Sequence, residues 1–148
     1  MAISTTWTEL YEDLHRHPEL SFEEERTAAI VADSLRTAGF EVETGVGRTG
    51  VVGVLRNGDG PTVLVRADMD ALPVTERTGL PYTSAVEGVA HACGHDVHVT
   101  CLLAACAELA ATGDTWAGTL LAVFQPAEEV GAGARASLDA ALYARHGT

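Results

Sequence analysis

The sequence predicts an α/β protein in which helices pack against a mixed β-sheet. Segments with apolar residues at helical spacing alternate along the chain with short runs rich in valine and leucine, which is the pattern of a layered α/β domain. The composition agrees: 47% of the 148 residues are hydrophobic and 20% are charged. Such a chain can bury a core, which argues against a disordered or coiled-coil protein. Its length fits one domain or part of a larger one.

Two helices are predicted in the first forty residues. The first covers 7–16 and ends before Pro18, because proline cannot continue a helix. Ser21 is the predicted N-cap of the second, with Glu24 three residues later closing a capping box. Gly39 is placed where a helix commonly ends in a left-handed residue. We expect the acidic run that includes Glu24 to be a solvated helix start.

The strands follow, and two more helices come after them. Strands are predicted at 41–46, 51–55, 62–65 and 118–124, and helices at 97–112 and 134–145. The Asn-Gly-Asp-Gly-Pro segment at 57–61 predicts a hairpin turn between the second and third strands. The third strand is nearly all apolar, as expected for a central strand buried on both faces.

Charge and cysteine content exclude several functional classes. The formal net charge is −12, which argues against nucleic acid or an acidic membrane as a partner. There is no lysine, which excludes a Schiff-base or phosphate-loop lysine. Three cysteines are an odd number and do not form a secreted disulfide framework. We see neither a signal peptide nor a membrane span, and we expect a cytoplasmic protein.

Polar side chains cluster at three places that the fold would bring together. Asp68 and Asp70 follow one predicted strand, and the pair 128–129 follows another. Cys93 and His95 precede a predicted helix. Because ligands of open α/β sheets bind at the carboxyl ends of strands, these loops are expected to converge on one crevice.

The residue types in this crevice predict a divalent metal site. Thiolate, imidazole and carboxylate are ligands that zinc and similar ions accept. Gly94 lets the backbone bend so that Cys93 and His95 face one ion, and the following helix N-terminus favours a thiolate at Cys93. Glu128 and Glu129 are adjacent, so in an extended segment one faces the ion and the other faces the substrate. We expect the remaining cysteines and several histidines to be structural or exposed: Cys101, Cys106, His15, His17, His98 and His146.

Four motifs occur in order along the chain, and together they resemble a known family. They are His-Arg-His-Pro-Glu-Leu-Ser-Phe-Glu-Glu at 15–24, Arg-Ala-Asp-Met-Asp-Ala-Leu-Pro at 66–73, His-Ala-Cys-Gly-His-Asp-Val-His at 91–98 and Phe-Gln-Pro-Ala-Glu-Glu at 124–129. This arrangement is similar to the amidohydrolase branch of the aminoacylase/carboxypeptidase metallopeptidases. That branch includes hippurate hydrolases, indole-acetyl-amino-acid hydrolases and N-acetyl-diaminopimelate deacetylases.

The resemblance implies a zinc-aminopeptidase-like catalytic domain, with helices on both faces of its sheet and two divalent ions (zinc, manganese, cobalt or nickel). It assigns metal ligands to Cys93, His95 and Glu129, the general base to Glu128, and a supporting position near the site to Asp70. The implied reaction is hydrolysis of the amide bond of N-acyl amino acids by metal-activated water.

The resemblance also implies that 1–148 is the N-terminal part of the catalytic domain. Members of the family continue into a Gly-x-His ligand segment, an inserted lid domain that also forms a homodimer, and a final ligand histidine. We therefore expect this chain to be truncated before the lid, to hold at most one weakly bound ion, and to have little or no amidase activity by itself.

Two other functions stay open at this point. One is a non-catalytic metal-binding or interaction module on the same scaffold, although a site that only binds a metal would not need Glu128. The other is a thiol redox protein that uses Cys93, but no Cys-x-x-Cys pair supports it.

Overall fold

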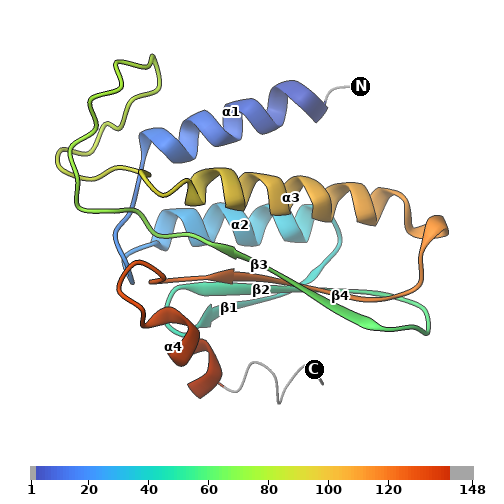
Figure 1. Ribbon diagram of the computed structural model, residues 1–148. Coiled ribbons are helices and arrows are strands. Elements are labelled where there is room, and N and C mark those ends of the chain that lie inside the picture. The colour runs from blue at the N-terminus through green and yellow to red at the C-terminus, as the bar shows by residue number, and fades with distance from the viewer. Residues whose placement is uncertain (1–2, 141–148) are drawn as a thin grey trace.

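The protein is a four-stranded mixed sheet with three helices on one face and a short helix on the other (Figure 1). The computed structural model describes residues 3–140 and the side chains from residue 6 onward. The order of elements is α1 Ile3–Arg16, α2 Glu25–Thr37, β1 Glu41–Val46, β2 Gly50–Asn57, β3 Thr62–Asp68, α3 His95–Ala111, a 3₁₀ turn Gly113–Thr115, β4 Gly118–Gln125 and α4 Gly133–Asp139. The predicted α/β class and mixed sheet are confirmed, and helices lie on both faces. Within the described residues, no helix is long and apolar enough to cross a bilayer.

The strand order is β1-β2-β4-β3, which corrects one prediction. β2 pairs with β1 and with β4, both antiparallel, and β3 pairs with β4 in parallel. The predicted hairpin between β2 and β3 is wrong because β4 lies between them. The turn residues at 57–61 fit a hairpin, but β4 is more fully apolar and gains more by occupying the centre, where nearly every residue is buried. The predicted central strand, β3, lies at the edge of this sheet with much of its length exposed.

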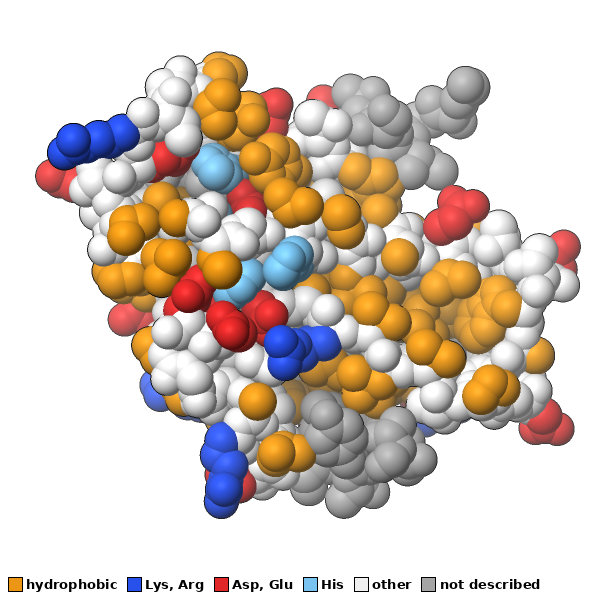
Figure 2. All heavy atoms as spheres, in the orientation of Figure 1, with side chains coloured by type: hydrophobic (Ala, Val, Ile, Leu, Met, Phe, Trp, Pro, Cys, Tyr) orange, Lys and Arg blue, Asp and Glu red, His pale blue; other side chains and the backbone are white. Residues whose placement is uncertain are grey.

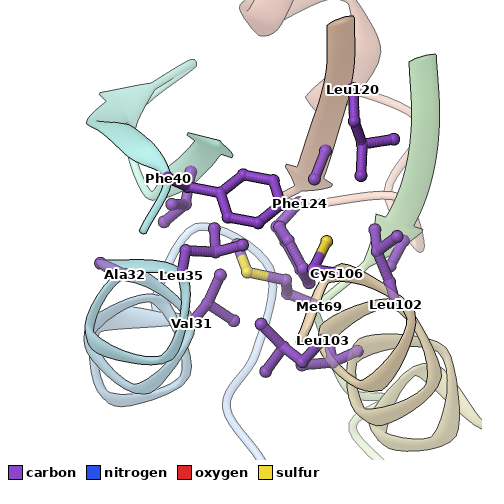
Figure 3. Packing of buried hydrophobic residues seen from close by; sticks show 14 of the residues in the cluster. Val31, Ala32, Leu35, Phe40, Met69, Leu102, Leu103, Cys106, Leu120 and Phe124 are labelled. Carbon is purple, nitrogen blue, oxygen red and sulfur yellow. The ribbon is translucent and has the colours of Figure 1, made fainter. Parts of the chain in front are cut away.

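The main core lies between the sheet and helices α1, α2 and α3. Phe124 of β4 and Met69 point toward Leu35 of α2 and Leu103 of α3, as Figure 3 shows, and each of these four is at most 2% exposed. The opposite face of the sheet carries a smaller cluster around Val52. Alternate residues of one strand therefore serve two cores, which the period of two in a strand requires.

The start of α2 differs from the prediction. Neither Ser21 nor Glu24 caps the helix with its side chain. Instead the carboxylate of Glu19 accepts hydrogen bonds from the backbone N–H groups of Arg26 (2.9 Å) and Thr27 (2.7 Å). The residues of a capping box are present at the right spacing, but the capping hydrogen bonds do not form. The reason is that Phe22 adopts a positive φ of 65° and turns the chain between Ser21 and the helix.

Other helix ends agree more closely with the sequence. Gly39 has a φ of 88°, the left-handed conformation predicted for the end of α2. α3 begins two residues earlier than predicted, so His95 lies in its first turn. α4 begins at Gly133, and the C-terminal part of the predicted helix, with His146, lies outside the described residues.

Candidate metal centre

Parallel pairing of β3 and β4 brings two of the polar loops to one edge of the sheet. Asp68 and Gln125 are register partners at the carboxyl ends of these strands, and the pairing extends one step further, where the N–H of Met69 donates to the carbonyl of Gln125 (3.0 Å). The chain segments that carry Asp70 and Glu129 therefore leave the sheet side by side. Acidic and His side chains gather on this face in Figure 2.

The third loop reaches the same place through a sharp turn at Gly94. This residue has a φ of 84°, a conformation that favours glycine, and it directly precedes α3. The turn allows Cys93 to lie before the helix and His95 to lie in its first turn. The predicted role of Gly94 in bending the backbone between these two residues agrees with this geometry.

Cys93, His95 and Glu129 each place one donor atom within 4.8 Å of the other two. The Oε1 atom of Glu129 is buried and has no hydrogen-bond partner among the described residues. A buried carboxylate oxygen without a donor is costly, and a cation at this point would satisfy it. Sulfur, nitrogen and oxygen donors at this spacing fit a divalent ion such as zinc. The sequence therefore identified a group that the fold does assemble.

The imidazole of His95 is oriented by the residue behind it. Its Nδ1–H donates to the backbone carbonyl of Asp70 (2.8 Å), which leaves Nε2 directed toward the acidic side chains. Nε2 lies 3.8 Å from Oε2 of Glu128 and 4.0 Å from Oε1 of Glu129. A hydrogen bond of this kind on the far nitrogen is typical of metal-binding histidines, because it fixes the ring and the tautomer.

Asp70 is completely buried, and it contacts both His95 and the loop that carries Glu128 and Glu129, called the acidic loop below. Its carboxylate accepts hydrogen bonds from the Ser21 hydroxyl (2.7 Å) and from the backbone N–H groups of Glu128 (3.1 Å) and Glu129 (2.9 Å). Burial alone would raise the pKa of Asp70, but these hydrogen bonds and the one with His95 lower it to about 2. The ionised Asp70 in turn raises the pKa of His95 to about 9. The largest cause is the hydrogen bond that the Asp70 carboxylate accepts from the ring.

The acidic neighbours act on Cys93 in the opposite direction to the prediction. Interaction with the nearby Glu129 carboxylate is the largest cause that raises the pKa of the Cys93 thiol, followed by burial and by the charges of neighbouring carboxylates. The helix N-terminus was expected to favour the thiolate, but in the metal-free chain burial and the neighbouring carboxylates raise the pKa of the thiol instead. A bound cation would reverse this balance.

Glu128 and Glu129 point in different directions. The side chain of Glu129 is 15% exposed and turns inward, whereas that of Glu128 is 42% exposed. The adjacent carboxylates are thus divided between the interior and the open side, as predicted, but the predicted extended segment is wrong because both residues lie in a turn that follows Ala127. Glu128 lies beside the three candidate ligands Cys93, His95 and Glu129, called the triad below, without belonging to them.

A second group of possible ligands overlaps the first, and its member His98 was not expected to take part. Asp68, His95 and His98 form a second group whose donor atoms lie within 4.8 Å of one another. Both groups use His95, and since its Nδ1 is engaged by Asp70, Nε2 can bind one ion in only one of them. His15 bonds to Asp96 (2.6 Å) and Glu76 (3.2 Å), in line with a structural role.

One residue was assigned wrongly by the sequence. Glu24 was expected at a solvated helix start, but it is 0% exposed and accepts a hydrogen bond from the backbone N–H of Ala127 (2.8 Å), next to the acidic pair. The only signal in the sequence was its place in the first of the four motifs, where the capping-box interpretation competed with it.

Comparison with known proteins agrees with this geometry. The model of peptidase family M20/M25/M40 matches residues 64–147. The chain is 49% identical over 133 residues to thermostable carboxypeptidase 1 of Saccharolobus solfataricus, covering 87% of this chain and 34% of that protein. It is 49% identical over 131 residues to hippurate hydrolase of Campylobacter jejuni, covering 88% of this chain and 34% of that protein.

A solved structure shows the same fold. The YXEP protein of Bacillus subtilis, described as a dinuclear metal-binding peptidase of the M20 family, superposes with a TM-score of 0.90 at 40% sequence identity, covering 96% of this chain and 40% of that one. The chain thus spans about a third of the length of the curated relatives that it matches. The match of more than half of its residues to the family model shows that the chain belongs to peptidase family M20/M25/M40.

Proposed function

We propose that this chain carries part of the active site of a metal-dependent amidohydrolase that cleaves the amide bond of N-acyl amino acids. The observation that carries the proposal is the meeting of donor atoms from Cys93, His95 and Glu129 within 4.8 Å, with the Glu128 carboxylate beside them. The relatives support the substrate class, since a carboxypeptidase and a hippurate hydrolase are both named for amides whose amine side is an amino acid with a free carboxylate.

The three ligand residues would hold a divalent ion, which when bound would supply Lewis-acid polarisation of the amide carbonyl and activation of water. A thiolate ligand favours zinc over magnesium, with manganese, cobalt and nickel as further candidates. We expect a second ion and a homodimer in a longer protein with the complete family ligand set.

Other steps of the proposed reaction are assigned to individual side chains of this chain. Glu128 would accept a proton from the attacking water and return it to the leaving amine, a role that its exposure on the open side permits. Asp70 would keep His95 in the tautomer that presents Nε2, and would hold the backbone of Glu128 and Glu129 in place. Cys93 would be bound as the thiolate once a cation offsets the carboxylates around it.

Cobalt binding tests the ligand assignment directly. Titration of the chain with Co²⁺ is expected to give a thiolate-to-cobalt absorption band. Cys93→Ser should abolish the band, whereas Cys101→Ser, a change at an exposed cysteine of α3, should leave it intact. A band that survives in Cys93→Ser, or that is lost in Cys101→Ser alone, would overturn the assignment.

A second pair of variants separates the base from the ligands. Glu128→Gln should keep cobalt affinity but lower hydrolysis of hippurate by roughly 10²–10⁴-fold, the usual contribution of a general base. Glu129→Gln should lose cobalt as well as activity. Because we expect little or no turnover from these 148 residues alone, hydrolysis is measured in a longer protein that has the complete family ligand set. If Glu128→Gln of that protein hydrolyses hippurate as fast as the unmodified protein, the site is a binding module rather than a catalytic one.

A further inference from the structure

Glu24 is a buried carboxyl group that connects three distant parts of the chain. It is 0% exposed and lies directly before α2. Its Oε1 accepts the backbone N–H of Ala127 (2.8 Å), and its Oε2 accepts the hydroxyl of Thr49. A buried carboxyl group is costly unless its oxygens find donors, so both contacts constrain where Glu24 and its partners lie.

The partner on the acidic loop is a strained residue. Ala127 is a non-glycine residue with a φ of 51°, in the left-handed region that L-residues rarely adopt. Its carbonyl accepts the N–H groups of Ala132 (3.2 Å) and Gly133 (3.0 Å), and it is itself fully buried. Such a conformation persists only where the surroundings fix it, and Glu24 supplies the bond to its N–H.

Three successive backbone N–H groups thus point at two buried carboxyl groups. Ala127 donates to Glu24, and Glu128 and Glu129 donate to Asp70. The conformation of Ala127 decides the direction in which the next two side chains leave the backbone. A change of φ at this residue would turn Glu129 away from the triad and Glu128 away from the open side.

We propose that Glu24 is a positioning residue that locks Ala127 in its left-handed conformation and so sets the placement of Glu128 and Glu129 at the metal centre. The inference rests on the proposed function, because the effect of Glu24 is exerted on the proposed metal centre. Glu24 itself is assigned no contact with metal or substrate. It differs from an ordinary burial role in that the consequence is local: loss of the bond should disturb metal binding more than it disturbs the fold.

Metal affinity of folded variants tests this difference. Glu24→Met removes both hydrogen bonds at similar volume and should weaken Co²⁺ binding by roughly 10–100-fold, as loss of a residue supporting metal ligands commonly does. Glu24→Gln keeps an acceptor for Ala127 and a polar group for Thr49, so its affinity should stay within about 3-fold of the unmodified chain. This rescue would assign the effect to hydrogen bonding rather than to charge or packing.

Glu19→Met is the matched control. Glu19 lies five residues away and anchors the start of α2 through Arg26 and Thr27, without contact to the acidic loop. Its loss should lower the melting temperature but leave Co²⁺ affinity unchanged. If Glu19→Met and Glu24→Met weaken cobalt binding equally, Glu24 acts only through general stability and the proposal fails.

Amide hydrogen exchange by NMR gives a readout that needs no metal. In Glu24→Met the N–H of Ala127 should exchange faster while that of Ala122, in the centre of β4, stays protected. If Glu24→Met does not fold, Thr49→Val, which removes one donor to Glu24, should weaken cobalt binding by about 2–10-fold. Unchanged affinity and unchanged protection of Ala127 would overturn the proposal.

The outcomes separate this proposal from the proposed function. An unmodified chain that gives no thiolate-to-cobalt band contradicts the metal centre, whereas exchange at Ala127 still decides whether Glu24 holds the loop. A chain that binds cobalt through Cys93 but is indifferent to Glu24→Met contradicts the positioning role alone.

Discussion

At the scale of single residues, His91 is a buried histidine without hydrogen-bond partners. It is 6% exposed, and neither ring nitrogen has a partner among the described residues. Burial is the largest cause that lowers its pKa to about 4, below the usual 6.5. Since the unfolded chain takes up this proton near pH 6.5 and the folded chain only near pH 4, the free energy of unfolding should fall as the pH drops through that window.

His91→Leu should remove this dependence. Between pH 7 and pH 5 the unmodified chain is expected to lose about 2 kcal/mol more stability than the variant, measured by urea unfolding at both pH values. Equal slopes of stability against pH in the two proteins would show that His91 is not buried as the structure has it.

Gly133 lies very close to the backbone of Pro126, at the end of the acidic loop. A Cβ atom built at this position lies 1.5 Å from the carbonyl oxygen of Pro126, so any side chain forces the turn to move. Gly133→Ala should destabilise the chain by roughly 1–3 kcal/mol and weaken cobalt binding. Gly113→Ala is the control, because its Cβ would lie 3.6 Å from the nearest atom. Thermal unfolding and a cobalt titration of both variants check the difference, and similar results for the two would contradict it.

At the scale of elements, the sequence predicts the helices and strands better than their pairing. The boundaries of β1 match the prediction, and those of β2 and β3 extend it by a few residues. Pairing was wrong because a turn such as 57–61 reports only that the chain reverses direction. Whether the two strands become neighbours depends on which strand occupies the position between them. In this sheet β4, which lies much further along the chain, occupies it.

The start of α2 shows the same limit for a local motif. Ser21 and Glu24 have the spacing of a capping box, yet their side chains bond elsewhere, Ser21 to Asp70 and Glu24 to the backbone N–H of Ala127. Glu19 performs the capping from outside the motif. Polar residues near a functional site thus have two possible uses, and spacing alone cannot choose between them.

A cap exchange experiment follows from this geometry. Glu19→Ala should cost about 1 kcal/mol of stability, the usual value of a helix cap, and should speed amide exchange at Arg26 and Thr27. Ser21→Ala should leave exchange at these two amides unchanged, because its hydroxyl bonds to Asp70 instead. The reverse pattern, with Ser21→Ala exposing the helix start, would restore the capping box.

At the scale of the whole molecule, the convergence of the site was predictable because it follows from strand direction. Side chains at the carboxyl ends of parallel β3 and β4 must lie at one edge of the sheet, whatever the details of the loops. The buried anchors Glu24 and Asp70 were less accessible to prediction, since their burial depends on loops that fold around them. A sequence pattern marks the groups that perform chemistry more readily than those that support them.

The exposed edge of the sheet should govern association of the molecule. Val63 and Val65 of β3, which is an edge strand in the described residues, are 52% and 40% exposed, and together with Trp116 they line a pocket. Such an edge favours pairing with a second copy. The net charge of −12 opposes contact between copies at low ionic strength, and salt screens that repulsion. We therefore expect association that increases between about 10 mM and 150 mM salt.

Charged substitutions locate the contact. Val65→Lys should reduce association, because a lysine on an edge strand blocks pairing. Val97→Lys changes a similarly exposed valine (44%) on α3 by the same charge and should leave association unchanged, which excludes an effect of net charge alone. Sedimentation velocity over a range of protein concentrations measures both variants. If the chain stays monomeric at 150 mM salt, or if Val97→Lys dissociates it as well as Val65→Lys does, the β3 edge is not the contact.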